Sequence, residues 1–199
     1  MKILGICGSH RKDSSTMFFL RKALEACGKE GPATEAVALE QYSIGACTAC
    51  DYCKTKLACS LQDDMHKLYE KMMSADAIII ASPVYFAMVS GMVKQMFDRS
   101  LPLRRNGMRL RDKVGGAIAV GASRNGGQEL VCQQIHSWMT LHEMIVVGDA
   151  GTAHFGGIGW VPRGTSPEDD ISGAETCGNL GRRIADVLKR MKGAKEGGV

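Results

Sequence analysis

The sequence predicts an α/β protein built around a doubly wound parallel sheet. Short apolar runs of strand length alternate with longer amphipathic segments along most of the chain. A parallel strand is buried on both faces, so it reads as an unbroken apolar run. Strands that alternate with helices imply right-handed βαβ crossovers, and therefore one sheet with helices on both faces.

Length and composition favour one ordinary globular domain. The chain has 199 residues, of which 45% are hydrophobic and 23% charged. The formal charge of +4 is too small and too dispersed to indicate nucleic-acid binding. No apolar run approaches the ~18 residues of a membrane span, and the N-terminal run does not resemble a signal peptide. We expect a single cytoplasmic domain over 1–199 with a flexible tail at 193–199.

The first strand is predicted at 2–7, and a hydroxyl-rich turn follows it. A helical pattern then runs from Met17 to about Glu30. The unpaired N–H groups and the dipole of a helix N-terminus favour an anion. Arg11 can add a charge, and hydroxyl donors can come from Ser9, Ser14, Ser15 and Thr16. The alternative is that Asp13 or Ser14 only caps the helix.

This turn lacks the glycine fingerprints of dinucleotide and nucleoside-triphosphate sites. It reads GSHRKDSST over 8–16, which is neither G-x-G-x-x-G nor G-x-x-x-x-G-K-[ST]. A terminal monophosphate is therefore the anion that fits best.

A second strand is predicted at 33–39, and a cysteine-rich loop follows it directly. The loop has the spacing C-x2-C-x2-C-x5-C at Cys47, Cys50, Cys53 and Cys59. Closely spaced thiolates are typical ligands of iron–sulfur clusters. The same thiolates can instead hold a tetrahedral zinc ion, or act without metal as structural or redox-active thiols. Clustered cysteines also indicate a reducing compartment.

Three further strands complete the predicted sheet. They lie at 77–81, 113–121 and 143–147. Further helices are expected after the caps Asp63 and Asp64, from Gly91 to about Ser100, from the end of loop 122–128 to about Leu141, and over 168–192. No element is predicted in the glycine-rich stretch 149–167.

Three loops of unusual composition should meet at one edge of this sheet. They are 8–16, 82–91 and 122–128, after the first, third and fourth strands. In the strand order 2-1-3-4-5 these strands are adjacent, and ligands bind beyond the C-terminal ends of such strands. The second strand lies beside the first, so we expect the cysteine loop to emerge at the same edge.

These motifs resemble those of the flavodoxin-like NAD(P)H-dependent FMN reductase superfamily, and specifically of its iron–sulfur flavoproteins. GSHRKDSST resembles the superfamily's GSPRKxxxT phosphate loop, with His10 in place of proline. SPVYF, with Gly91, Lys94 and Asp98-Arg99 after it, is similar to the second loop, and ASRNGGQ to the third. The similarity covers residues 1–150 and continues weakly through the last helix.

The resemblance implies a flavodoxin-like five-stranded sheet that binds FMN and a [4Fe–4S] cluster, with no acid–base triad. The FMN phosphate would be held by Ser9, Arg11, Ser15 and Thr16. The isoalloxazine ring would be lined by Pro83, Val84, Tyr85 and Phe86. Its pyrimidine edge would be approached by Ala122, Ser123, Gly126, Gly127 and Gln128. The cluster would be ligated by Cys47, Cys50, Cys53 and Cys59.

The function implied is electron transfer from a ferredoxin-like carrier to a small acceptor. An alternative is a cluster-free, NAD(P)H-dependent FMN oxidoreductase acting on quinones or similar acceptors, because relatives without a cluster also carry cysteines in this loop. A zinc-stapled, non-catalytic binding module is a third hypothesis. The resemblance also implies a homodimer or homotetramer. The segment 151–164, with His154, Phe155 and Trp160, either covers the flavin or packs across a subunit contact.

Overall fold

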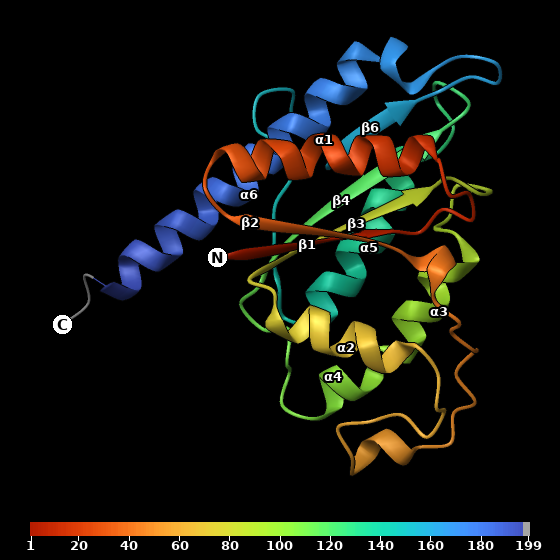
Figure 1. Ribbon diagram of the computed structural model, residues 1–199, viewed down its shortest axis with the longest axis vertical. Helices are drawn as coiled ribbons and strands as arrows, with labels where there is room; N and C mark the ends of the chain where they lie inside the picture. Colours follow the sequence, from red (N-terminus) through yellow and green to blue (C-terminus); the bar gives the residue numbers. More distant parts are fainter. Residues whose placement is uncertain (197–199) are drawn as a thin grey trace.

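The structure is a computed structural model that describes residues 1–196, and it has the predicted doubly wound sheet (Figure 1). Five parallel strands follow the order β2-β1-β3-β4-β5, as expected. Their bounds are Lys2–Cys7 for β1, Ala33–Ala38 for β2, Ala77–Pro83 for β3, Val114–Gly121 for β4 and Ile145–Val146 for β5.

Helices cover both faces of the sheet. Figure 1 shows α1 and α6 along one face and α2, α3, α4 and α5 on the other. The helices are α1 Ser15–Lys29, α2 Met65–Ser74, α3 Gly91–Arg99, α4 Leu101–Arg105, α5 Gln128–Leu141 and α6 Ile171–Glu196. The short α4 was not predicted. Three 3₁₀ turns are η1 Leu39–Gln41, η2 Tyr52–Lys54 and η3 Pro167–Asp169.

The central strands are buried on both sides, which explains their unbroken apolar sequences. Along β1, Ile3 and Cys7 pack with α1 and α6, whereas Leu4 and Ile6 pack with the helices on the other face. Successive side chains of a strand point to opposite faces, so one strand contributes to two cores. The two cores hold β1, β3 and β4 in fixed register.

The sequence analysis missed one strand, β6 (Gly157–Trp160). It pairs with Ile118–Gly121 of β4, whereas β5 pairs only with Val114 and Gly115 at the start of β4. The chain leaves the sheet after β5 and returns beside the same strand. A Cβ atom on Gly157 or Gly159 would lie within 2.6 Å of a side chain of α6 or α1, so the strand needs glycine there. Those glycines remove the alternating pattern by which a strand is recognised.

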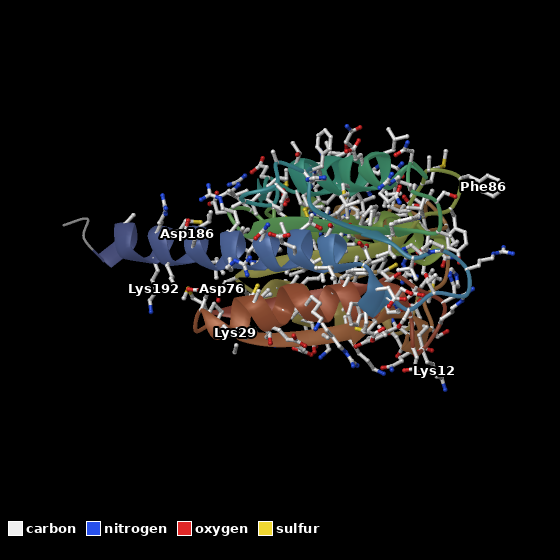
Figure 2. All side chains as sticks on the ribbon, turned by 90° about the horizontal axis from the view of Figure 1, so that it is seen from above. Lys12, Lys29, Asp76, Phe86, Asp186 and Lys192 are labelled. Carbon is white, nitrogen blue, oxygen red and sulfur yellow. The ribbon has the colours of Figure 1, made fainter. Side chains whose placement is uncertain are left out.

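The C-terminal helix is longer than predicted. It continues through Glu196, so the part of the expected tail at 193–196 is helical, and 197–199 lie outside the described residues. Figure 2 shows the last turns of α6, around Lys192, extending beyond the packed layers. No helix within residues 1–196 is long and apolar enough to cross a membrane.

Helices α1 and α6 approach closely at Gly181. A Cβ atom at this position would lie 2.2 Å from the carbonyl oxygen of Ala23. The Cys27 thiol also donates a hydrogen bond to the Gly181 carbonyl, at 3.2 Å. Backbone is in contact with backbone here, so a larger residue must push the helices apart.

We therefore expect Gly181→Ala to lower the free energy of unfolding by about 1–3 kcal/mol, the usual cost of overpacking a core. Gly178→Ala, one turn earlier, is the matched control. Its Cβ would meet only the end of the Arg182 side chain at 3.5 Å, and alanine is the better helix former by roughly 1 kcal/mol. Urea unfolding of both variants checks this. Equal destabilisation of the two would contradict the close-approach argument.

Candidate functional site

The C-terminal ends of β1, β3 and β4 surround an open cavity of about 510 Å³. This volume lies within the range of small-molecule sites, about 300–1,000 Å³. Nine of the predicted flavin-site residues line it: Ser9, Arg11, Ser14, Ser15, Thr16, Pro83, Val84, Tyr85 and Ala122. The predicted convergence of three loops at one edge is therefore present in the structure.

The first loop provides the polar part of this cavity. Ser14 is the N-cap of α1, and its Oγ accepts from the N–H of Met17 at 3.1 Å. Ser14 therefore caps the helix, but the cap does not exclude an anion site. The N–H groups of Ser15 and Thr16 lie in the first helical turn, where no intrahelical acceptor exists. Arg11 is exposed beside them.

The second loop is joined to the first by buried serines. The Ser90 hydroxyl donates to the carbonyl of Gly8 at 2.7 Å, and the Ser90 N–H donates to Ser82 Oγ at 2.9 Å. Tyr85 and Met88 then close a two-residue turn with φ of +51° at Phe86 and +59° at Ala87. Tyr85 stays on the cavity wall, but this turn directs Phe86 outward, where it is 96% exposed. Phe86 does not line the cavity.

The third loop contributes only Ala122 to the cavity. The Gln128 side chain folds back, donating to the Ser123 carbonyl at 2.7 Å and accepting from the Gly126 N–H at 2.9 Å. Gly127, with φ of +96°, lies against Ala87 of the second loop. Ser123, Gly126, Gly127 and Gln128 therefore shape and support the loops rather than line the cavity.

A fourth wall of the cavity comes from the segment that follows β6. It consists of Val161, Pro162, Arg163, Gly164 and Thr165, and the Val161 N–H bonds the Gly121 carbonyl at 2.9 Å. One of the two sequence interpretations of segment 151–164 placed it over the flavin, and its residues 161–164 do line this cavity; the strand β6 that positions them was missed. The sequence signal that could have revealed this segment is the turn formers Pro162 and Gly164, which follow the short run Gly159-Trp160-Val161.

The residues just before β6 do not line this cavity. His154 and Phe155 line a different pocket, together with His136. Within segment 151–164, only the last residues, 161–164, therefore line the cavity in which a flavin is expected.

The four predicted metal ligands line a second pocket, of about 130 Å³. Cys47, Cys50, Cys53 and Cys59 share it with Arg99 and Arg105. The Cys50 Sγ lies 3.1 Å from Ser60 Oγ, and this hydrogen bond, with one from the Tyr52 backbone, lowers the pKa of the Cys50 thiol. No group of three or more His, Cys, Asp or Glu side chains within residues 1–196 is arranged to hold a metal ion.

The donor set fits a cubane cluster, in which each thiolate binds a separate iron atom. The remaining cysteines are unsuited to ligation because they are buried in the cores. Cys7 and Cys132 are core thiols, at 1% and 0% exposure. Cys27 and Cys177 are also fully buried, and burial raises the pKa of Cys27 to about 12.

A buried ion pair attaches the cysteine loop to α3. Arg99 donates through Nη1 and Nη2 to the two Asp63 oxygens at 2.7 and 2.9 Å, and also to the Gly45 carbonyl at 2.8 Å. Asp63 in turn accepts from the N–H groups of Gly45 and Met65 at 2.9 and 3.1 Å. Burial alone would raise the pKa of Asp63, but these hydrogen bonds outweigh it and lower the pKa to about 2.

The expected helix caps, Asp63 and Asp64, therefore have a further role. Asp63 accepts from a backbone N–H of the first turn of α2, that of Met65, whereas Asp64 Oδ1 accepts there from the Lys67 side chain at 2.7 Å. Asp64 Oδ2 accepts from the N–H of Ser43 at 2.8 Å, and the Asp64 side chain accepts no capping bond from a backbone N–H of the helix. Both carboxylates hold the start of the cysteine loop.

The unpredicted helix α4 supports the other side of the loop. Asn106 Nδ2, just after α4, donates to the carbonyls of Cys53 and Lys56 at 3.1 and 3.0 Å. Arg105 Nη1 lies 3.2 Å from both Cys53 Sγ and Asp51 Oδ1. The loop is thus fixed to the α3–α4 junction by side chains distant from it in sequence.

The two pockets are separate within the chain. They share no lining residue, and Figure 1 shows the cysteine loop beside α4, away from the ends of β1, β3 and β4. The loop does begin after β2 at the predicted edge, but its cysteines lie against the α3–α4 junction.

Comparison with known proteins gives a consistent result. Residues 1–156 match the NADPH-dependent FMN reductase family. An iron–sulfur flavoprotein of Methanocaldococcus jannaschii is 49% identical over 195 residues, covering 96% of this chain and 100% of that protein. An iron–sulfur flavoprotein of Methanosarcina thermophila is 44% identical over 189 residues, covering 95% and 96%.

A solved structure supports the fold. A flavone reductase superposes with a TM-score of 0.73 at 21% identity, covering 96% of this chain and 64% of that one. The sheet order and this likeness together show a flavodoxin-like fold.

We expect Asp63→Asn to lower the free energy of unfolding at pH 7 by roughly 2–3 kcal/mol, because Arg99 would lose its charged partner while buried. The pKa of Asp63 lies below its ordinary value of 3.8, so its contribution is present above that pH and is lost as pH falls toward 2. The difference between wild type and variant should therefore shrink between pH 4 and 2 in urea unfolding.

Asp98→Asn is the control for this prediction. Asp98 is an exposed partner of Lys94 on the same helix, and such a pair contributes about 0.5 kcal/mol or less. A variant Asp63→Asn as stable as Asp98→Asn at pH 7 would show that the buried pair does not hold the loop.

Proposed function

This chain belongs to the NADPH-dependent FMN reductase family and, within it, to the iron–sulfur flavoproteins, and from that premise we propose that it combines FMN with a [4Fe–4S] cluster to transfer electrons from a ferredoxin-like donor to a small acceptor. It is a flavin-dependent oxidoreductase with a flavodoxin-like fold. The observation that carries the proposal is that all four loop thiols line one pocket, apart from a cavity suited to FMN.

The residues of the larger cavity fit FMN. The hydroxyls and first-turn N–H groups of 14–16 suit a phosphate, and Arg11 supplies a compensating charge. Pro83, Val84 and Tyr85 provide an apolar and aromatic wall for a ring. Ser90 and Gln128 hold the loops in place, and no residue is required to act as a nucleophile.

FMN exchanges one or two electrons and a cubane cluster exchanges one, so a protein that holds both can link two-electron and one-electron partners. In this chain Cys47, Cys50, Cys53 and Cys59 would hold the cluster. Arg99 and Arg105 line the same pocket, and Arg105, whose Nη1 is 3.2 Å from Cys53 Sγ, can compensate the charge of a thiolate. The residues of both sites thus position the cofactors and balance their charge.

A cluster-free NAD(P)H-dependent FMN oxidoreductase is the second candidate. It is favoured by the NADPH dependence in the description of the family. It is also compatible with Cys47 and Cys50 as exposed thiols. The two candidates differ in whether iron is bound and in how fast NADPH reduces the flavin.

We expect protein purified without oxygen to contain about four irons and four sulfides per chain, with broad visible absorption beside the flavin bands. Cys50→Ala should lose iron and sulfide but retain FMN, because Cys50 does not line the FMN cavity. Ser60→Ala, which removes only the hydroxyl beside Cys50, should retain both cofactors.

Flavin bands without iron or sulfide, together with rapid flavin reduction by NADPH, would replace the proposal with the second candidate. Protein without bound flavin would contradict both and would favour a binding module.

The phosphate assignment predicts a specific effect of Arg11→Gln. Loss of a charge-assisted hydrogen bond of about 1.5 kcal/mol should raise the Kd for FMN about tenfold. The Kd for riboflavin, which has no phosphate, should not change. Lys12→Gln removes the same charge at the next residue, which does not line the cavity, and should leave both constants unchanged. Flavin fluorescence titration of the apoprotein measures all of these.

A further inference from the structure

Arg105 lies at the rim of the cysteine pocket and contacts a predicted cluster ligand. Its Nη1 is 3.2 Å from Cys53 Sγ and 3.2 Å from Asp51 Oδ1. The side chain comes from the last residue of α4, whereas Asp51 and Cys53 belong to the loop. One guanidinium nitrogen thus faces both a thiol and a carboxylate.

Other charged groups at this pocket are engaged elsewhere. Arg99 is bound to Asp63, and Asp98 is bound to Lys94. Asp51 also accepts from Lys54 through Oδ2 at 2.8 Å. Among these groups, Arg105 is the cation that contacts a ligand sulfur, and Asp51 is the anion beside it.

The loop does not need Arg105 for its position. Asn106 already holds the carbonyls of Cys53 and Lys56, and the Arg99–Asp63 pair holds Gly45 at the start of the loop. The hydrogen bond from Arg105 to sulfur is therefore additional to the contacts that hold the backbone. Its effect should fall on the charge of the thiolate.

We propose that Arg105 and Asp51 act through the Cys53 sulfur and have opposite effects on the reduction potential of the cluster, Arg105 raising it and Asp51 lowering it. This inference rests on the proposed function, because it requires the cluster. Adding one electron makes a centre held by four thiolates more negative, so a cation hydrogen-bonded to a ligand sulfur favours the reduced form. A carboxylate at the same place disfavours it. Hydrogen bonds to the sulfurs and net charge are known determinants of cluster potentials.

The test is a redox titration of the cluster in the FMN-containing protein, followed by electron paramagnetic resonance. In Arg105→Gln we expect the ratio of reduced to oxidised cluster at a fixed potential to fall about tenfold, a shift of about 59 mV for one electron. Arg104→Gln is the matched control. It removes the same charge from the preceding residue, whose Nε donates to the Leu141 carbonyl and which does not line the pocket, so its ratio should change less than twofold.

Asp51→Asn tests the opposite effect on the reduction potential. Asp51 has a left-handed backbone with φ of +60°, a conformation that asparagine also adopts readily. This variant should raise the reduced fraction, whereas Arg105→Gln lowers it. A general loosening of the loop would not produce shifts of opposite sign.

Iron and sulfide are assayed in each protein before titration. The inference is overturned if the reduction potential shifts equally in the two arginine variants or shifts in neither. It is also overturned if the potential shifts in the same direction in Arg105→Gln and Asp51→Asn. None of these outcomes affects the proposed function. If Arg105→Gln loses iron, Asp51→Asn decides: a higher potential supports the inference, and an unchanged or lower one overturns it. Wild-type protein without iron overturns the proposed function as well.

Discussion

The buried ion pair between Arg99 and Asp63 determines where the cysteine loop lies. The Arg99 side chain is completely inaccessible, and a charge in that position is tolerated only with a well-aligned, opposite partner. Asp63 provides that partner in bidentate form, and the two side chains also bind the N–H and the carbonyl of Gly45. A loop of thirteen residues from Cys47 to Cys59 has little apolar surface with which to pack, so polar contacts of this kind must fix it.

The larger cavity depends on a different constraint, namely the adjacency of β1, β3 and β4. Parallel strands end at one edge of a sheet, so the loops after them converge without contacts of their own. The hydrogen bonds of Ser90 and Gln128 then fix the shapes of these loops. Gln128 and Gly126 were expected to contact a ligand, but they bond within their own loop and do not line the cavity. The segment that follows the paired strand β6 adds the fourth wall.

Much of the fold could be predicted from the sequence because burial on both faces produces continuous apolar strands. Ala77–Ala81 and Lys2–Cys7 are recognisable without any tertiary information. Gly157 and Gly159 of β6 were not, because close packing against Cys177 and Phe19 replaces side chains with glycine. The spacing of the four cysteines predicted that a compact loop brings them together, and they line one pocket. The contacts of Arg99 and Arg105 could not, because their partners are 36 and 52 residues away in sequence and are brought near only by folding.

Helix α3 connects the two sites. Its N-cap, Ser90, bonds the first loop of the FMN cavity through Gly8, and its last residue, Arg99, holds the cysteine loop through Asp63. Nine helical residues span about 14 Å at 1.5 Å per residue, so one short rigid element fixes two loops of different chemistry. Because β2 is at the edge of the sheet and, within residues 1–196, pairs only with β1, the chain after it can leave the sheet without interrupting another strand pair. The fold can therefore accommodate a cysteine pocket beside α3 and α4 while the strand-end cavity stays intact.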